Sequence, residues 1–294
     1  MEQVSHQTPP DDTSVLASHH DCREHALPAV AGGRVIALIR DHGGDLKASA
    51  GSVPTKKSAA LAVCAAELAR ALAGLDVTQR LRRFRDEVDG PVVFTTGFGL
   101  EGQVILHHIW EAGLDIDVVT LDTGRLFPET YATWEATERR YDRRIRAIYP
   151  RRPRLEALIA DQGINGFYRS KEARTACCDA RKVEPLRRAL TGAQGWITGL
   201  RADQSAFRNE ASLVDHERNL LKLNPLIDWT RQDAEDFAAA HDVPVNPLHQ
   251  KGFPSIGCAP CTRAVRPGEP ERAGRWWWED ESKKECGLHV AAYR

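Results

Sequence analysis

Short apolar runs alternate with amphipathic segments from residue 91 to residue 149, and this alternation constrains the fold more than any other feature of the sequence. Residues 92–95 are rich in β-branched side chains, and residues 103–110 follow them with helical spacing. Residues 116–121 repeat the apolar run, and residues 128–141 follow as a helix with proline near its first turn. Strands that alternate with helices predict an α/β fold with a doubly wound, mostly parallel sheet.

The expected sheet also predicts where the chemistry lies. Residues 145–149 and 195–198 add two further short strands to the pattern. Ligands of doubly wound sheets bind outside the carboxyl ends of the strands. We therefore expect the functional residues in the loops after Phe94, Leu121 and Thr198.

The sequence divides into three parts. Residues 1–85 are predicted to be an N-terminal extension with a mobile, polar beginning and a helical region after it. Residues 86–245 carry the α/β pattern of the main domain. Residues 246–294 are rich in glycine, proline, cysteine and tryptophan, so a ligand or docking on the main domain must order them.

The overall charge is balanced, with 40 Lys and Arg against 41 Asp and Glu and a formal net charge of -1. This balance disfavours duplex nucleic acid or an anionic membrane as a partner, so an anion site must be local. The sequence has no apolar run long enough to span a membrane, and its first residues do not form a signal peptide. We expect a cytoplasmic protein, and a homo-oligomer is compatible with the sequence.

Four of the 7 cysteines stand in two tight pairs, Cys177 with Cys178 and Cys258 with Cys261. Four thiolates are the ligand set of a 4Fe-4S cluster or of a tetrahedral zinc ion. Adjacent cysteines suit the usual spacing of zinc sites poorly, so the pattern favours a cluster and leaves zinc open. Cys286 lies outside this set, between glutamate and glycine and near His289, and is a candidate thiolate nucleophile.

The loop between the first expected strand and its helix contains Gly97, Gly99 and Gly102. Backbone N–H groups in such a loop can bind a phosphate at the helix N-terminus. The loop matches neither common phosphate-binding fingerprint, so an ordinary tight turn is an equal interpretation.

Several longer motifs stand in order along residues 90–291. They are Leu-Asp-Thr-Gly-Arg-Leu-Phe-Pro-Glu-Thr-Tyr at 121–131, Cys-Cys at 177–178 with Arg-Lys-Val-Glu-Pro-Leu at 181–186, Thr-Gly-Leu-Arg at 198–201 with Asp-Gln-Ser at 203–205, Asn-Pro-Leu at 224–226, Gly-Cys-Ala-Pro-Cys at 257–261, Gly-Arg-Trp-Trp-Trp-Glu at 274–279 and Glu-Cys-Gly-Leu-His at 285–289. In these motifs the chain resembles the adenylyl-sulfate and phosphoadenylyl-sulfate reductases of assimilatory sulfate reduction, which leads to cysteine.

The resemblance implies an adenine-nucleotide α-hydrolase-like fold, in which residues 86–245 would be the nucleotide-binding domain, and a reaction in two steps. The Cys286 thiolate would attack the sulfur of adenylyl sulfate, release AMP and become S-sulfocysteine; thioredoxin or a glutaredoxin-like dithiol would then free sulfite. Lys182, Arg272 and Arg275 resemble the sulfate-site cations of the family, and His289 stands beside the nucleophile. The other substrate-binding positions carried over are Gly97, Gly99, Glu101, Asp122, Thr123, Arg125 and Arg201.

The four paired cysteines resemble the branch of the family that carries a 4Fe-4S cluster and uses adenylyl sulfate. One departure concerns the glycine loop, where Gly97 replaces the usual serine and Gly102 stands where aspartate is common. Three alternatives stay open: a phosphoadenylyl-sulfate reductase, a zinc-stabilised nucleotide-binding protein without catalysis, and an adenylating enzyme of similar fold.

Overall fold

The structure is a computed structural model that describes residues 56–205, 208–279 and 288. The strands are β1 (Val92–Thr96), β2 (Asp117–Leu121), β3 (Arg146–Ile148), β4 (Gly195–Ile197), β5 (Val214–Glu217) and β6 (Leu220–Leu223). The longer helices are α1 (Lys56–Leu72), α2 (Val77–Glu87), α3 (Leu100–Glu111), α4 (Pro128–Tyr141), α5 (Arg152–Gln162), α6 (Lys171–Cys178), α7 (Glu184–Ala189) and α8 (Arg231–Ala240). Short helical turns are η2 (Gly166–Tyr168), η3 (Asp179–Val183, a π-helix), η4 (Ala202–Gln204), η6 (His249–Lys251) and η7 (Ala259–Cys261).

The strands form a sheet in the order β3-β2-β1-β4-β6-β5. All neighbouring pairs are parallel except β5 with β6, which are antiparallel. The chain moves outward from β1 to β3, then returns to the other side of β1 with β4. The predicted fold class, α/β with a doubly wound and mostly parallel sheet, is confirmed.

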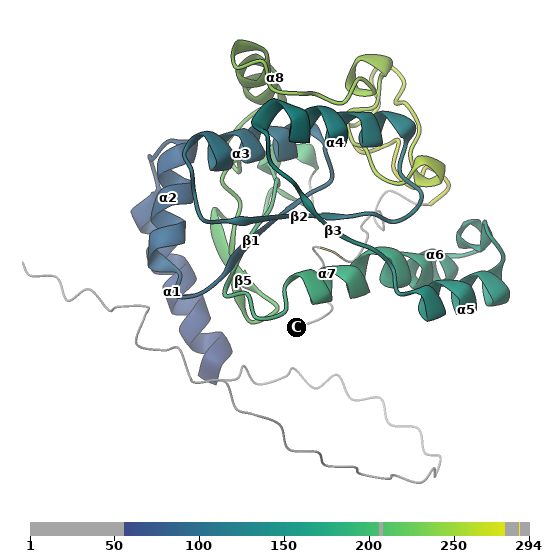
Figure 1. The fold of residues 1–294 in the computed structure, drawn as a ribbon, viewed down its shortest axis with the longest axis horizontal. Coiled ribbons are helices and arrows are strands. Elements are labelled where there is room, and N and C mark those ends of the chain that lie inside the picture. The colour runs from purple at the N-terminus through teal and green to yellow at the C-terminus, as the bar shows by residue number, and fades with distance from the viewer. Residues whose placement is uncertain (1–55, 206–207, 280–287, 289–294) are drawn as a thin grey trace, which may run out of the picture.

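Helices cover both faces of the sheet (Figure 1). On one face lie α3, α4 and α8, and their apolar side chains join those of α1 and α2 in the larger core, around Phe84 and Ile105. On the other face lies α7, with α5 and α6 beyond it, and Leu186 packs there with Trp196 of β4. Burial of both sheet faces explains why β1 begins with three consecutive apolar residues and β4 is buried along its whole length.

Local sequence signals account for several element boundaries. Asp76 accepts a hydrogen bond from the Gln79 backbone N–H at 2.9 Å and caps α2. Pro128 stands in the first turn of α4, as expected from its fixed φ. Gly74, with φ of 76°, separates α1 from α2 inside the region predicted to be helical. The predicted domain boundaries stay a prediction, and residues 1–55 lie outside the described residues.

The hairpin of β5 and β6 was not expected from the sequence. Its two turn residues, Arg218 and Asn219, have φ of 56° and 60°. Both values belong to the left-handed region that a two-residue hairpin turn requires. Within the described part of the chain, no helix has the length and apolar character that crossing a membrane needs.

Candidate active site

A cavity of about 230 Å³ opens where the strand order reverses, between β1 and β4. Thr95 near the end of β1, Gly97 directly after β1 and Gly199 after β4 line it, together with residues of the segment after α8. A second cavity of about 180 Å³ shares several of these residues and extends toward Thr123 after β2. The loops after Phe94, Leu121 and Thr198 therefore meet at the site, as the sequence predicted.

The glycine loop forms one wall of the first cavity. Phe98 has φ of 58°, its N–H donates to Thr96 Oγ1 at 3.1 Å, and its ring stacks on Trp134 at 5.4 Å. Gly99 is the N-cap residue of α3, which begins at Leu100, and no side chain of its own caps the helix. The loop thus presents backbone rather than side chains to the cavity, which suits close approach of an anion.

The two departures in this loop have different structural consequences. A Cβ at Gly102 would lie 2.8 Å from Thr96 Oγ1, so the nearby threonine requires glycine there. A Cβ at Gly97 would meet no atom within 4 Å, so a serine at this position would fit.

Basic side chains from distant segments line the first cavity: Lys182, Arg208, Arg272 and Arg275. Arg275 lies against Gly257, where a Cβ would stand 2.2 Å from its Nη2, and its Nε has no hydrogen-bond partner among the described residues. Glu101 and Glu271 are the acidic residues of the lining. With four basic and two acidic residues, the lining of the cavity has a net positive charge, which favours an anionic ligand.

Arg201 lies beneath the cavity and holds its acidic residues in place. Its side chain is 0 % exposed, its Nε donates to Glu101 Oε1 at 2.8 Å, and its Nη2 donates to Glu271 Oε2 at 3.0 Å. Asp203 is its third acidic partner.

The pKa values of Glu101 and Glu271 shift in opposite directions, although both carboxylates pair with Arg201. Burial favours the neutral form of Glu101, but the charge and hydrogen bond of Arg201 outweigh it and lower the pKa of that carboxyl. Burial raises the pKa of Glu271, and Arg201 only partly offsets it. Arg201 therefore keeps Glu101 ionised next to the glycine loop.

Three of the four paired cysteines lie close together at the end of the molecule that carries α6. Cys258 and Cys261 pack with Phe167 and Trp276 in a small buried cluster, and Cys177 packs against it. Cys178 interacts with the buried Arg174. Among the described residues, no group of three or more His, Cys, Asp or Glu side chains could hold a metal ion, so the expected 4Fe-4S cluster is not shown.

The surroundings of these thiols are basic on one side and apolar on the other. Burial would raise the pKa of Cys258, but Lys182, a hydrogen bond with Thr123 Oγ1 at 3.3 Å, and Arg275 bring it below its usual value. Burial raises the pKa of Cys261 to about 12, with the nearby Cys258 adding to the shift. Cys258 is thus the thiol that the protein charges stabilise as a thiolate.

Two buried N–H donors near the cysteines find no acceptor in the part of the chain that the structure describes. The indole Nε1 atoms of Trp276 and Trp278 are buried beside the cysteines and have no hydrogen-bond partner among the described residues. Buried donors usually have partners. The buried thiols of Cys258 and Cys261 and these two N–H groups are compatible with an anionic iron–sulfur group.

Comparison with known proteins identifies the family of this chain. Residues 91–264 match the model of the phosphoadenosine phosphosulfate reductase domain family. The chain belongs to this family. A protein of Sinorhizobium fredii named adenosine 5'-phosphosulfate reductase is 54% identical over 222 residues, covering 75% of this chain and 88% of the relative. One of the same name from Allochromatium vinosum is 50% identical over 200 residues, covering 67% and 78%.

A solved member of the phosphoadenosine phosphosulfate reductase family supports the fold. The phosphate complex of phosphoadenylyl-sulfate reductase from Candida auris matches with a TM-score of 0.60 and 24% identity, covering 73% of this chain and 100% of that one. At this level of identity the likeness concerns the fold alone.

The structure brings together part of the predicted site. Gly97, Gly99, Glu101, Lys182, Arg272 and Arg275 line the first cavity and Thr123 lines the second. Cys286 and His289 lie outside the described residues. Leu288 stands between them in the sequence and lines both cavities.

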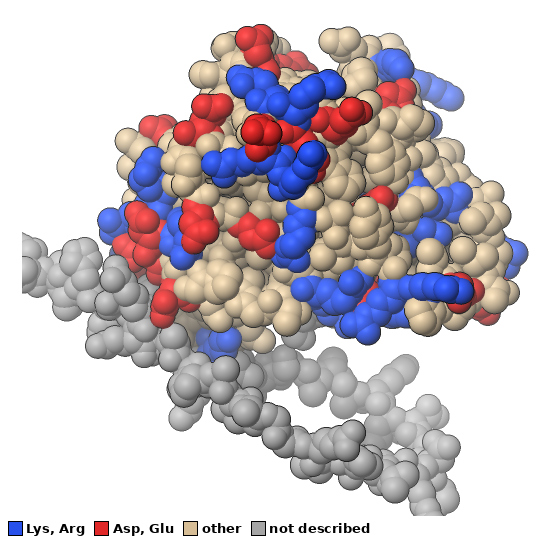
Figure 2. Space-filling model, viewed as in Figure 1, with Lys and Arg blue, Asp and Glu red and all other residues tan. Residues whose placement is uncertain are grey.

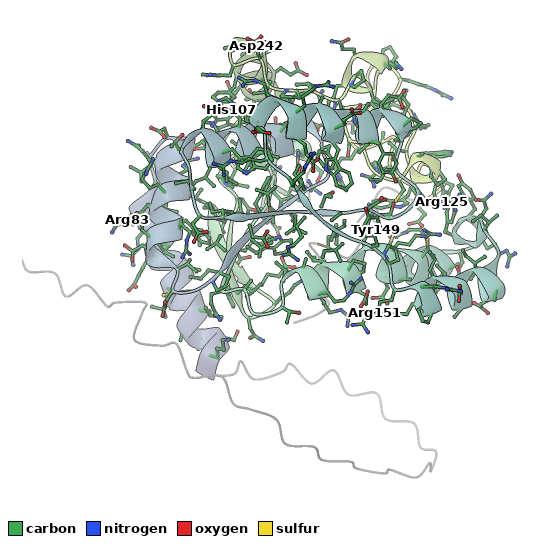
Figure 3. The ribbon with its side chains drawn as sticks, in the orientation of Figure 1. Arg83, His107, Arg125, Tyr149, Arg151 and Asp242 are labelled. Carbon is green, nitrogen blue, oxygen red and sulfur yellow. The ribbon has the colours of Figure 1, made fainter. Side chains whose placement is uncertain are left out.

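Three predicted substrate-binding residues are not among the lining residues of either cavity that the structure describes. Asp122 accepts hydrogen bonds from the Gly124 N–H and the Tyr131 hydroxyl, both at 2.8 Å. Arg125 lies at the end of the molecule near α6 and donates to Asn165 Oδ1 at 2.9 Å (Figure 3). Arg201 is enclosed by its carboxylates, and the binding role of all three stays a prediction.

Two cavity residues, Glu271 and His249, were missed by the sequence analysis. Glu271 directly precedes Arg272, a predicted sulfate-site residue, so its position in the sequence could have suggested that it lies at the site. His249 stands between an Asn-Pro-Leu turn and the cysteine motif without any pattern of its own.

Proposed function

We propose that this chain reduces adenylyl sulfate to sulfite and AMP in sulfate assimilation, with Cys286 as the nucleophile. The observation that carries the proposal is the position of Leu288, two residues beyond Cys286, in the wall of a cavity lined by Lys182 and Arg275. The relatives named adenosine 5'-phosphosulfate reductase support adenylyl sulfate as the substrate.

The cavity residues would bind and orient the nucleotide before any bond changes. The backbone of the glycine loop would receive the phosphate, and Lys182, Arg272 and Arg275 would face the sulfate. Their charges offset the repulsion between a thiolate and an anionic sulfur, which is the main barrier to attack.

The proposed reaction balances in two steps. The Cys286 thiolate attacks the sulfur, an S–S bond forms, and the bond between sulfur and the bridging oxygen breaks, so that AMP leaves with that oxygen. One thiolate of a thioredoxin-type dithiol then attacks Cys286 Sγ to form a mixed disulfide, and sulfite leaves with the electrons of the broken S–S bond. The second thiolate attacks the mixed disulfide, closes the disulfide of the dithiol and releases the Cys286 thiolate. The dithiol supplies both electrons.

Cys177, Cys178, Cys258 and Cys261 would hold a 4Fe-4S cluster. The cluster would supply structural order and local charge rather than electrons, since the dithiol already provides these. The basic side chains of Lys182 and Arg275 would then lie between the thiolate ligands and the substrate. We also propose a cytoplasmic location, because cysteine thiolates that hold an iron–sulfur cluster persist in a reducing compartment.

Turnover of the two nucleotides tests the substrate. We expect anaerobically purified protein with thioredoxin to form sulfite from adenylyl sulfate much faster than from its 3'-phosphorylated form. The reverse preference would make the chain a phosphoadenylyl-sulfate reductase.

Iron, zinc and acid-labile sulfide analysis of the same preparation tests the cofactor. We expect iron and sulfide in equal amounts. The Cys258→Ala chain should contain neither iron nor sulfide. Zinc without sulfide, together with no turnover of either nucleotide, would instead support a zinc-stabilised binding protein.

A further inference from the structure

His249 connects two segments that are far apart in the sequence and that both contribute residues to the lining of the cavity. Its Nε2 accepts a hydrogen bond from the Leu100 backbone N–H at 3.2 Å, at the first residue of α3. Its Nδ1 lies 2.9 Å from the Phe253 carbonyl oxygen. Because a carbonyl only accepts, Nδ1 carries the proton and Nε2 is the free acceptor, so these partners define a neutral ring.

These contacts supply the cap that the sequence of α3 lacks. Gly99 has no side chain to cap the helix, and the usual capping residues would add a side chain at the loop. An aspartate there would also place a negative charge where a phosphate must bind. A neutral imidazole from another segment caps the helix without this charge.

We propose that His249 is a positioning residue for the proposed reaction, which caps α3 and thereby holds the glycine loop in the shape that receives the nucleotide phosphate. This inference rests on the proposed function for its ligand, and on the hydrogen bonds of the described residues for its geometry. The same ring holds the Phe253 carbonyl, and the three residues that follow Phe253 line the cavity.

The charges around His249 set the pH at which the cap is lost. Burial and Arg231 of α8 lower its pKa, whereas Glu101 of α3, the Phe253 carbonyl and Glu235 of α8 act in the opposite direction. The net shift is downward, so the neutral ring persists below the usual pKa of histidine. As pH falls further, protonation removes the acceptor for the Leu100 N–H.

The test measures binding of adenylyl sulfate by calorimetry in the full chain carrying Cys286→Ser, which stops sulfur transfer. We expect His249→Ala to weaken binding roughly tenfold, the cost of one lost hydrogen bond at a buried donor. His249→Gln should restore most of the affinity because its Oε1 can take the place of Nε2, whereas the shorter His249→Asn should not.

A pH series between about 5 and 8 distinguishes capping from direct contact. The affinity for adenylyl sulfate of the chain with His249 intact should decrease as the pH is lowered. The affinity of the His249→Gln chain should not show this decrease. Tighter binding in acid that depends on His249 would mean that the imidazolium contacts the phosphate, and would overturn the positioning role. Equal affinities of His249→Ala and the parent would overturn it as well.

Hydrogen exchange of the Leu100 amide separates this inference from the proposed function. In the ligand-free chain, exchange should accelerate in His249→Ala and stay slow in His249→Gln. If the Cys286→Ser chain with His249 intact does not bind adenylyl sulfate, the proposed function fails while the cap can still be confirmed or rejected by exchange. Unchanged exchange in His249→Ala would reject the cap itself.

Discussion

Arg201 beneath the cavity and the arginines over α5 and α7 make ion pairs of similar length, but the first is buried and the others are exposed to solvent. Arg201 pairs with Glu101 at 2.8 Å and is 0 % exposed, whereas Arg152 pairs with Glu156 at 2.7 Å and its side chain is 87 % exposed. Figure 2 shows the second group as a basic patch over α5 and α7, where Figure 3 labels Arg151. Burial, rather than the number or length of ion pairs, should therefore decide what each pair contributes.

The largest effect is expected for Arg201→Leu. This change leaves Glu101 and Glu271 buried without their shared cation, and we expect a loss of about 3–5 kcal/mol in the free energy of unfolding. Urea unfolding followed by circular dichroism measures it. A loss no larger than that of an exposed pair would contradict the distinction drawn from burial.

His108 extends the comparison to a buried titratable group whose hydrogen bond goes to a hydroxyl rather than to a charge. Its Nδ1 lies 2.8 Å from Thr78 Oγ1, and burial, with His107 nearby, lowers its pKa to about 4 from 6.5. The unfolded chain binds the proton more readily, so stability present above pH 6.5 is lost as pH falls toward 4. The loss should reach about 3 kcal/mol at most.

Unfolding curves at a series of pH values check this slope. His108→Leu should flatten it relative to the parent, because the variant has no proton to bind at this position. If the free energy of unfolding falls equally with pH in both proteins, groups other than His108 cause the loss of stability in acid.

Glu279→Gln should have an intermediate effect. Glu279 accepts two hydrogen bonds from Arg174, both at 2.8 Å, and Arg174 also lies over the Trp276 ring at 4.9 Å. Loss of one charged bond should cost about 1.5–3 kcal/mol. Chemical unfolding measures the cost, and Glu156→Gln is a matched control from an exposed pair.

The smallest effect is expected at the exposed patch. Arg152→Ala removes an ion pair between residues four apart on α5, and we expect a change below about 0.5 kcal/mol. The same unfolding assay applies. A loss comparable to that of Glu279→Gln would show that exposure does not weaken these pairs.

The sequence predicted those features that depend on local pattern. Apolar runs and helical spacing located β1 to β4, and the motifs located the glycine loop and the cysteines. The hairpin of β5 and β6 was missed because its turn, Arg218 and Asn219, lacks the glycine that usually marks such turns. The enclosure of Arg201 and the cap by His249 depend on contacts between segments far apart in sequence, which no local pattern contains.

The central claim is that Cys286 takes the sulfonate group from adenylyl sulfate, and mass spectrometry tests it most directly. Anaerobic protein is incubated with adenylyl sulfate without reductant, digested and analysed for peptides that gain one SO₃ unit. The account predicts this gain on the peptide that contains Cys286, its loss when thioredoxin is added, and its absence in Cys286→Ser. An adduct on another cysteine, or no adduct while the nucleotide binds and the metal centre is intact, would contradict the account.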